Sequence, residues 1–126
     1  MWAKLGLYSI MCKIYYGAIV FVNIPYNEHN PHQHHGKHHY ICISNNMACT
    51  YSPVIQCIPT SSNIHRRLPV QCEVKADCFP KRTFALAEQM TLLPKNVLEH
   101  GRFCGELEAN SMKALQKAIK IQLSLD

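Results

Sequence analysis

Histidine is concentrated in one polar segment, residues 27–39 (NEHNPHQHHGKHH), which holds six of the eight histidines of the chain. An imidazole exchanges protons near neutral pH, so this segment can supply a general acid or base. Imidazoles joined by a third donor can also bind zinc, nickel or copper. No cysteine or carboxylate stands at a paired spacing here. We therefore expect no resident metal, and we keep a metal-binding loop and a solvated polar loop as alternatives.

A hydroxyl-rich segment, Thr60, Ser61 and Ser62, follows the apolar run at residues 54–58 and is predicted to be a small loop. Hydroxyl groups donate to phosphate oxygens, although the same residue types are common in ordinary turns. Arg66 and Arg67 come shortly afterwards. Such arginines either contact a phosphate backbone or are solvated surface charges. The residue types alone leave both uses open.

Composition sets the scale on which these groups must be arranged. The chain has 126 residues, of which 48% are hydrophobic and 17% charged. That balance supports one domain with a compact core and argues against a disordered chain. The formal net charge of +5 suits a nucleic-acid backbone or an acidic protein partner.

Seven cysteines are present, an odd number, and none forms a C-x-x-C pair. This pattern favours neither a disulfide framework nor a zinc ribbon. Cys42 and Cys57 stand within apolar runs, where a thiol behaves as a small hydrophobic group. We expect reduced thiols in a cytoplasmic protein.

The N-terminal apolar stretch, residues 5–11, is too short to cross a membrane, and Lys13 interrupts it. A spanning helix needs about 20 apolar residues, so we expect no membrane association. We interpret residues 1–12 as an extension or a mis-assigned start, and residues 13–126 as a single domain.

Short β-rich runs separated by turn residues dominate the chain and predict a small, mainly β barrel. Near the C-terminus, apolar side chains recur at helical spacing, and Asn110 or Ser111 is placed to cap that helix. The predicted strands are 17–26, 40–44, 54–58, 68–74, 83–88 and 101–107, with a polar, turn-rich connection at 45–53 and a turn region at Pro94.

The colinear order of these segments resembles the MazF/PemK family, the ribonuclease toxins of type II toxin–antitoxin systems. The resemblance is carried by GAIVFVNIPY at 17–26, SNN at 44–46, YSP at 51–53, PTSS at 59–62, AEQ at 87–89, CGEL at 104–107 and the helical segment 114–125. It implies an SH3-like β-barrel with a C-terminal α-helix, assembled as a homodimer. It also implies sequence-selective cleavage of single-stranded RNA, and a cognate antitoxin whose acidic, disordered tail folds onto a basic groove.

The resemblance also implies a chemistry in which the ribose 2′-hydroxyl attacks its own phosphate, without metal or cofactor. That reaction needs a base, an acid and positive charge beside the phosphate. The Gly-Gly-x-Arg-Pro pattern of the family is matched by residues 35–39, where the arginine and proline are absent. His38 falls at the arginine position and is the predicted acid or base. Lys37 is predicted to supply charge, and Thr60 matches the catalytic hydroxyl.

The remaining predicted site residues are RNA-binding ones: His39, Ser61, Ser62, Arg66, Arg67 and Glu88. Glu88 matches the glutamate of a family Glu-Gln motif and is equally suited to a structural hydrogen bond. Loss of the family arginine keeps a second interpretation open, a catalytically inactive module that binds RNA or protein. The related CcdB family, which poisons DNA gyrase, extends that alternative to a DNA-associated target.

Overall fold

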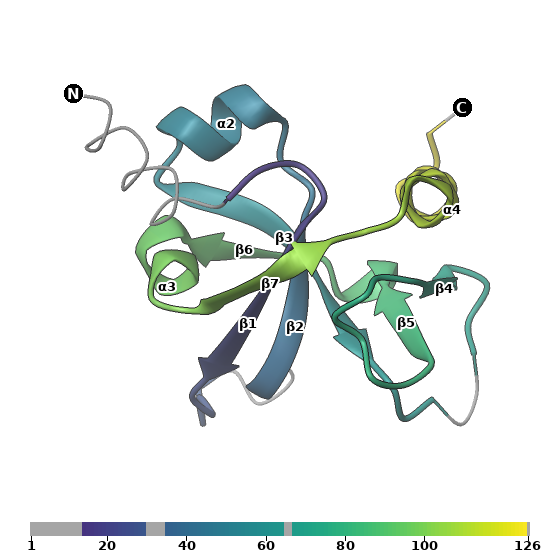
Figure 1. Cartoon of the computed structure of the whole chain (residues 1–126), viewed down its shortest axis with the longest axis horizontal. Coiled ribbons are helices and arrows are strands. Elements are labelled where there is room, and N and C mark those ends of the chain that lie inside the picture. Colours follow the sequence, from purple (N-terminus) through teal and green to yellow (C-terminus); the bar gives the residue numbers. More distant parts are fainter. Residues whose placement is uncertain (1–13, 30–34, 65–66, 126) are drawn as a thin grey trace.

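The structure, a computed structural model, describes residues 14–29, 35–64 and 67–125. Seven strands form a curled antiparallel sheet in the order β4-β5-β3-β2-β1-β7, with β6 paired to β3 (Figure 1). The strands are β1 Ala18–Ile24, β2 Gly36–Cys42, β3 Val54–Ser61, β4 Gln71–Val74, β5 Thr83–Leu86, β6 Thr91–Pro94 and β7 Arg102–Glu106. The helices are α2 Asn46–Tyr51, α3 Lys95–Glu99, α4 Ala109–Gln122 and the short 3-10 helix η1 Ala87–Gln89.

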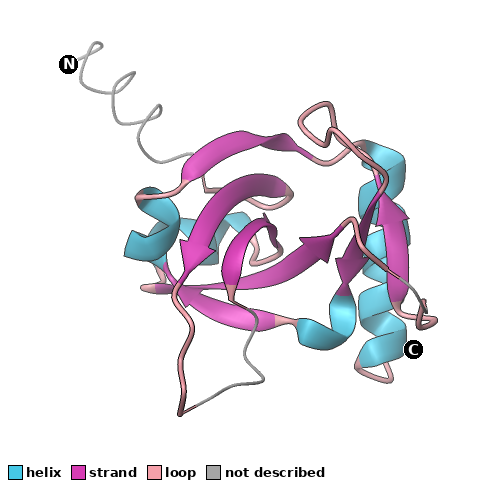
Figure 2. Ribbon diagram, turned by 90° about the horizontal axis from the view of Figure 1, so that it is seen from below, coloured by secondary structure: helices cyan, strands magenta, loops and turns pink. Residues whose placement is uncertain are grey.

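The mainly β half-barrel with a C-terminal helix confirms the predicted fold class. Figure 2 shows the strands curving around a common axis, with α4 along one side. The strands predicted at 17–26, 54–58 and 101–107 correspond to β1, β3 and β7. The predicted N-terminal extension lies outside the described residues.

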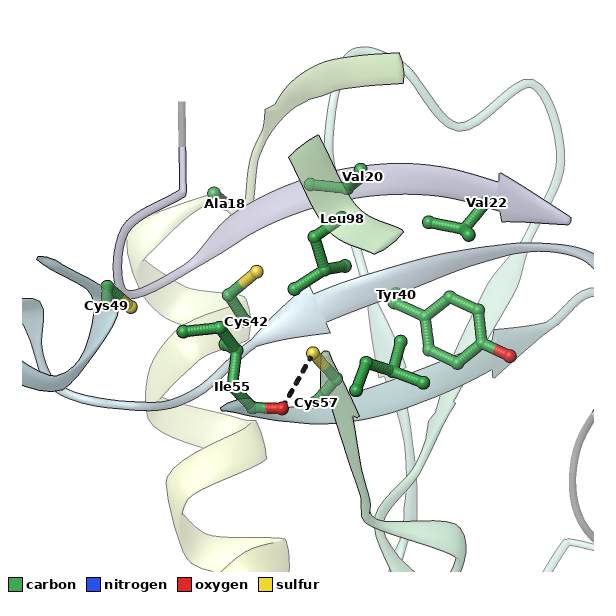
Figure 3. Packing of buried hydrophobic residues seen from close by; sticks show 10 residues of the cluster. Ala18, Val20, Val22, Tyr40, Cys42, Cys49, Ile55, Cys57 and Leu98 are labelled. Atoms are coloured by element: carbon green, nitrogen blue, oxygen red, sulfur yellow. Dashed lines mark hydrogen bonds between the residues drawn. The ribbon is translucent and has the colours of Figure 1, made fainter. Parts of the chain in front are cut away.

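Side chains of β1, β2 and β3 alternate between two buried clusters, because successive residues of a strand point to opposite faces. One cluster, the α3 core, includes Val20, Tyr40, Cys57 and Leu98 of α3 (Figure 3). The other, the α4 core, includes Ile19, Ile41, Ile58, and Leu115 and Ala118 of α4. Every residue of these three strands therefore has a defined face.

Two strands are longer than the sequence predicts, and both extensions fall at the candidate site. β2 begins at Gly36, inside the histidine segment, because its first residues pair with the end of β1. β3 runs on to Ser61, since Thr60 and Ser61 pair with Ala85 and Phe84 of β5. The hydroxyl-rich segment is thus largely strand rather than the predicted loop.

Pro59 occupies an unusual position in β3, which is central in the sheet. Residues 54–57 of β3 pair with β6, and Thr60 and Ser61 pair with β5. Pro59 pairs with Tyr40 of β2 on one side of β3 and stands in the gap between β6 and β5 on the other, so its missing N–H removes no bond from the β6 or β5 ladder. The strand can therefore change partners at the proline and carry Thr60 and Ser61 toward β5.

The helices correct three predictions. The 45–53 connection contains α2, whose N-cap Asn45 accepts a hydrogen bond from the Ala48 amide at 2.8 Å. α4 begins at Ala109 with Glu108 as N-cap, so neither Asn110 nor Ser111 caps it. Ser111 instead accepts a hydrogen bond from the Lys75 amide at 2.8 Å, which ties the helix to the end of β4. The Pro94 region, read as a turn, holds β6 and α3.

Candidate active site

A pocket of about 330 Å³ lies where the first residues of β2 meet the last residues of β3. We call it the β2–β3 pocket. Phe21, Phe79 and Lys81 contribute to its walls. Six predicted site residues also line it: Lys37, His38, His39, Thr60, Ser61 and Ser62.

The two histidines present their side chains on opposite faces of β2. Tyr40 pairs with Pro59, so the register places His39 beside Thr60 and His38 beside Ser61. The Thr60 hydroxyl donates to the His39 carbonyl at 2.9 Å, which agrees with that register. Alternation then groups His39 with Thr60 on one face and His38 with Ser61 on the other.

His39 is half-buried between two aromatic rings. Its ring centroid is 4.9 Å from that of Phe21 and 5.5 Å from that of Phe79. Burial lowers the pKa of His39 below its ordinary 6.5, and the charge of Arg102 and then that of His38 lower it further. His39 is therefore neutral at pH 7 and able to accept a proton.

The hydroxyl groups of the pocket differ in availability. Thr60 is 4% exposed, and its hydroxyl proton is donated to the backbone of β2. This hydrogen bond gives Thr60 a structural role, because it joins β3 to β2. The Ser61 hydroxyl accepts from the Asn63 amide at 3.1 Å, which leaves its own proton for a ligand. Ser61 is thus better placed than Thr60 to donate to a phosphate oxygen.

Positive charge reaches the pocket from three elements. Lys37 of β2 and Lys81, just before β5, both line the cavity. The Arg102 guanidinium lies 5.2 Å from the Phe21 ring, and its charge acts on His39. Sequence reasoning missed Arg102. Its proximity depends on strand register, and no signal in the sequence specifies that β7 pairs with β1.

Two other predicted residues, Glu88 and Arg67, have structural partners outside the pocket. Glu88, on η1, accepts a hydrogen bond from the Gln71 side chain at 2.7 Å, and so joins η1 to β4. The Arg67 guanidinium lies 5.8 Å from the Phe84 ring. Neither residue lines the cavity. Arg66 falls outside the described residues, so its predicted RNA contact stays a prediction.

Within the described ranges, no three histidine, cysteine or carboxylate side chains are grouped to hold a metal ion. Two histidines of the metal alternative, His32 and His34, lie outside those ranges. No described helix is long and apolar enough to cross a membrane.

Comparison with known proteins places this geometry in a family. Residues 15–123 match the family described as PemK-like, MazF-like toxin of type II toxin–antitoxin systems. This chain belongs to the MazF/PemK toxin family. The predicted resemblance is confirmed over nearly the whole described chain. No protein of curated function matches the sequence.

Solved MazF structures share the fold. An endoribonuclease from a mycobacterial species, in complex with its cognate antitoxin, superposes with a TM-score of 0.72 at 18% identity, covering 89% of this chain and 96% of that one. MazF from Deinococcus radiodurans gives 0.73 at 15% identity, with 88% and 96% covered. The Mycobacterium tuberculosis toxin MazF-mt6 gives 0.68 at 17% identity, with 85% and 97% covered. At these identities the likeness establishes the MazF-like fold.

Proposed function

We propose that this MazF/PemK protein is a toxin that cleaves single-stranded RNA at the β2–β3 pocket, with sequence preference and without a metal or cofactor. The observation that carries the proposal is the pocket itself. It gathers imidazoles, a free hydroxyl and two lysines on a scaffold whose solved relatives include endoribonucleases. These are the groups that an attack by the ribose 2′-hydroxyl requires.

In the proposed reaction, the 2′-oxygen bonds to phosphorus while the bond from phosphorus to the 5′-oxygen breaks. The proton leaves the 2′-hydroxyl for a base, and an acid gives a proton to the departing 5′-oxygen. The products are a 2′,3′-cyclic phosphate and a 5′-hydroxyl. Attack and departure are roughly in line at phosphorus, so base and acid belong on opposite sides of it.

The opposed histidines suit that requirement. We assign the base to His39, which is neutral at pH 7, and the acid to His38. Lys37 and Lys81 neutralise the phosphate charge, as point charges in place of the planar fork of an arginine. Ser61 donates to a phosphate oxygen. Thr60 acts as a positioning residue through its bond to His39.

We further propose that the toxin is a cytoplasmic homodimer controlled by an antitoxin with an acidic tail. Solved relatives include MazE–MazF complexes of Deinococcus radiodurans. Four exposed apolar side chains on α2, β3 and β6 offer a surface for a second copy: Met47, Tyr51, Val54 and Leu92. Leu92→Glu should shift the mass in light scattering from twice 14.4 kDa toward 14.4 kDa, while Gln122→Glu should not. A wild-type monomer at micromolar concentration contradicts the dimer.

Histidine in place of the family arginine favours one other candidate, an inactive module that binds RNA or protein on the same scaffold. A single experiment separates the two. Purified protein is incubated with a long RNA in excess chelator, and the new ends are mapped. Cleavage leaving cyclic phosphate and 5′-hydroxyl ends supports the enzyme. Intact RNA that is nevertheless bound supports the inactive module, and cleavage that EDTA abolishes and zinc restores supports metal catalysis.

A further inference from the structure

A second pocket, of about 530 Å³, lies on the other side of Phe21, where α3 turns into β7. We call it the α3–β7 pocket. Phe21 lines both pockets, so the two adjoin across this one residue. Gly101 lets the turn close on β1, because a Cβ there would stand 2.9 Å from the Phe21 carbonyl oxygen and from Val20.

Arg102 supplies the charge of this second pocket. Phe21 pairs with His39 on one side and with Arg102 on the other, so the three residues form one row across β2, β1 and β7. The guanidinium lies over the Phe21 ring at 5.2 Å, which orients it before any ligand arrives. Within the described part of the chain, the one salt bridge joins Arg82 and Glu73. Arg102 therefore forms no ion pair with a carboxylate of the described residues.

The rest of the pocket wall carries both donors and acceptors. Asn23 and Asn96 each bring an exposed amide. The His100 Nδ1 lies 2.6 Å from the Asn96 carbonyl oxygen and donates to it, which fixes the orientation of the ring. A side-chain amide both donates and accepts hydrogen bonds, so it can pair with the edge of a base. The carboxylates of an acidic peptide would need only cations and hydrogen-bond donors.

We propose that the α3–β7 pocket binds the nucleotide adjacent to the one that is cleaved. Arg102 takes its phosphate, and the amides of Asn23 and Asn96 read its base. The inference rests on the proposed RNA cleavage at the β2–β3 pocket, and it adds a specificity site made by β1, α3 and β7. The shared wall at Phe21 makes the two nucleotides neighbours on one strand.

Binding is tested with a fluorescent 2′-O-methyl RNA of random sequence, which lacks the attacking hydroxyl and stays intact. Arg102→Ala should weaken binding about tenfold and reduce the slope of log affinity against log salt by about 1. Arg102→Lys should restore the slope but only part of the affinity, because an ammonium lacks the bidentate fork. Lys117→Ala, on the exposed face of α4, is the charge-matched control.

Base reading is tested by mapping cleavage ends across a long RNA. Asn23→Ala and Asn96→Ala should each relax the preference at one position beside the cut about tenfold, at the low end of what a good amide–base pair provides. Gln122→Ala is the amide-matched control, and thermal melting confirms folding of each variant.

The outcomes separate the two proposals. If wild type cleaves RNA but the Arg102 and asparagine variants behave as their controls do, the α3–β7 site is wrong and the proposed activity stands. If wild type neither binds nor cleaves RNA, the proposed function fails and the second site fails with it.

Discussion

The two faces of β2, at its first residues, give two neighbouring histidines different surroundings. His39 lies between Phe21 and Phe79, loses solvent and keeps a neutral ring. His38 faces the other way, beside Ser61 and over Gly36, where a Cβ would stand 3.6 Å from the His38 Nε2. Identical side chains one residue apart thus acquire different chemistry from strand alternation alone. An acid and a base can be made from one dipeptide.

The largest expected effect comes from removing either imidazole. His38→Ala and His39→Ala should each lower the single-turnover cleavage rate by roughly 10²–10⁴-fold, the usual worth of a positioned acid or base. His35→Ala, in the same segment but outside the pocket lining, should leave the rate unchanged. A His38→Ala/His39→Ala double variant that cleaves at the wild-type rate would sink the histidine assignment.

The paired hydroxyls should respond in opposite ways. Ser61→Ala should lower the cleavage rate roughly 10-fold or more, because it removes a hydrogen bond to a charged phosphate. It should change stability little, because the Asn63 amide that it frees is exposed and can bond to water. Thr60→Val should reduce the free energy of unfolding by about 1 kcal/mol, because the His39 carbonyl loses its donor. Single-turnover kinetics measures the expected effect of Ser61→Ala on the rate, and urea denaturation measures the expected effect of Thr60→Val on stability.

Reversed results for these hydroxyls would exchange their roles. Thr60→Ser, which keeps the donor, is the control for the stability measurement. If Thr60→Val abolishes cleavage while unfolding as wild type does, Thr60 is the phosphate donor that the sequence predicted.

Stability should depend on pH through His39. Its folded pKa lies below the unfolded value, so between the two values the unfolded chain binds more protons. The stability that the neutral ring contributes is present above about pH 6.5 and is lost as pH falls through that value toward the folded pKa. His39→Phe keeps the aromatic packing and should flatten the slope of unfolding free energy between about pH 7 and 5. An unchanged slope would show that His39 titrates normally.

The smallest expected effect concerns the chemical labelling of cysteines on and near the face of β2 that carries His38. Cys42 lies on that face, opposite Cys57 in the α3 core, and both are fully buried. The hydrogen bond with Cys42, and then burial, raise the pKa of Cys57, and burial raises that of Cys49 to about 11. Iodoacetamide at pH 8 should therefore label the partly exposed Cys104 in the native protein and spare these three until denaturant is added. Labelling of Cys57 in the native state would mean that this face opens.

The sequence predicted more about the composition of the pocket than about its geometry. β-branched runs bounded by turn residues located β1 and β3, and the family-like order brought the histidine and hydroxyl segments together. The sequence could not show which face of the sheet each side chain occupies. A shift of one residue in the pairing of β2 with β3 would move every side chain of a strand to the opposite face. For the same reason the sequence predicted Thr60 as the catalytic hydroxyl, whereas the observed register favours Ser61 as the donor to a phosphate oxygen. α2, α3 and β6 were missed because short elements depend on tertiary packing rather than on local pattern.

The early start of β2 has a consequence for the energetics of RNA binding. A histidine-rich loop would have to lose its conformational freedom each time a substrate arrived, at a backbone entropy of about 1–2 kcal/mol per residue. Because Lys37, His38 and His39 are already paired with β1, that ordering is complete when the chain folds. The entropy cost of ordering these residues therefore reduces the free energy of unfolding and is not subtracted from the affinity for RNA.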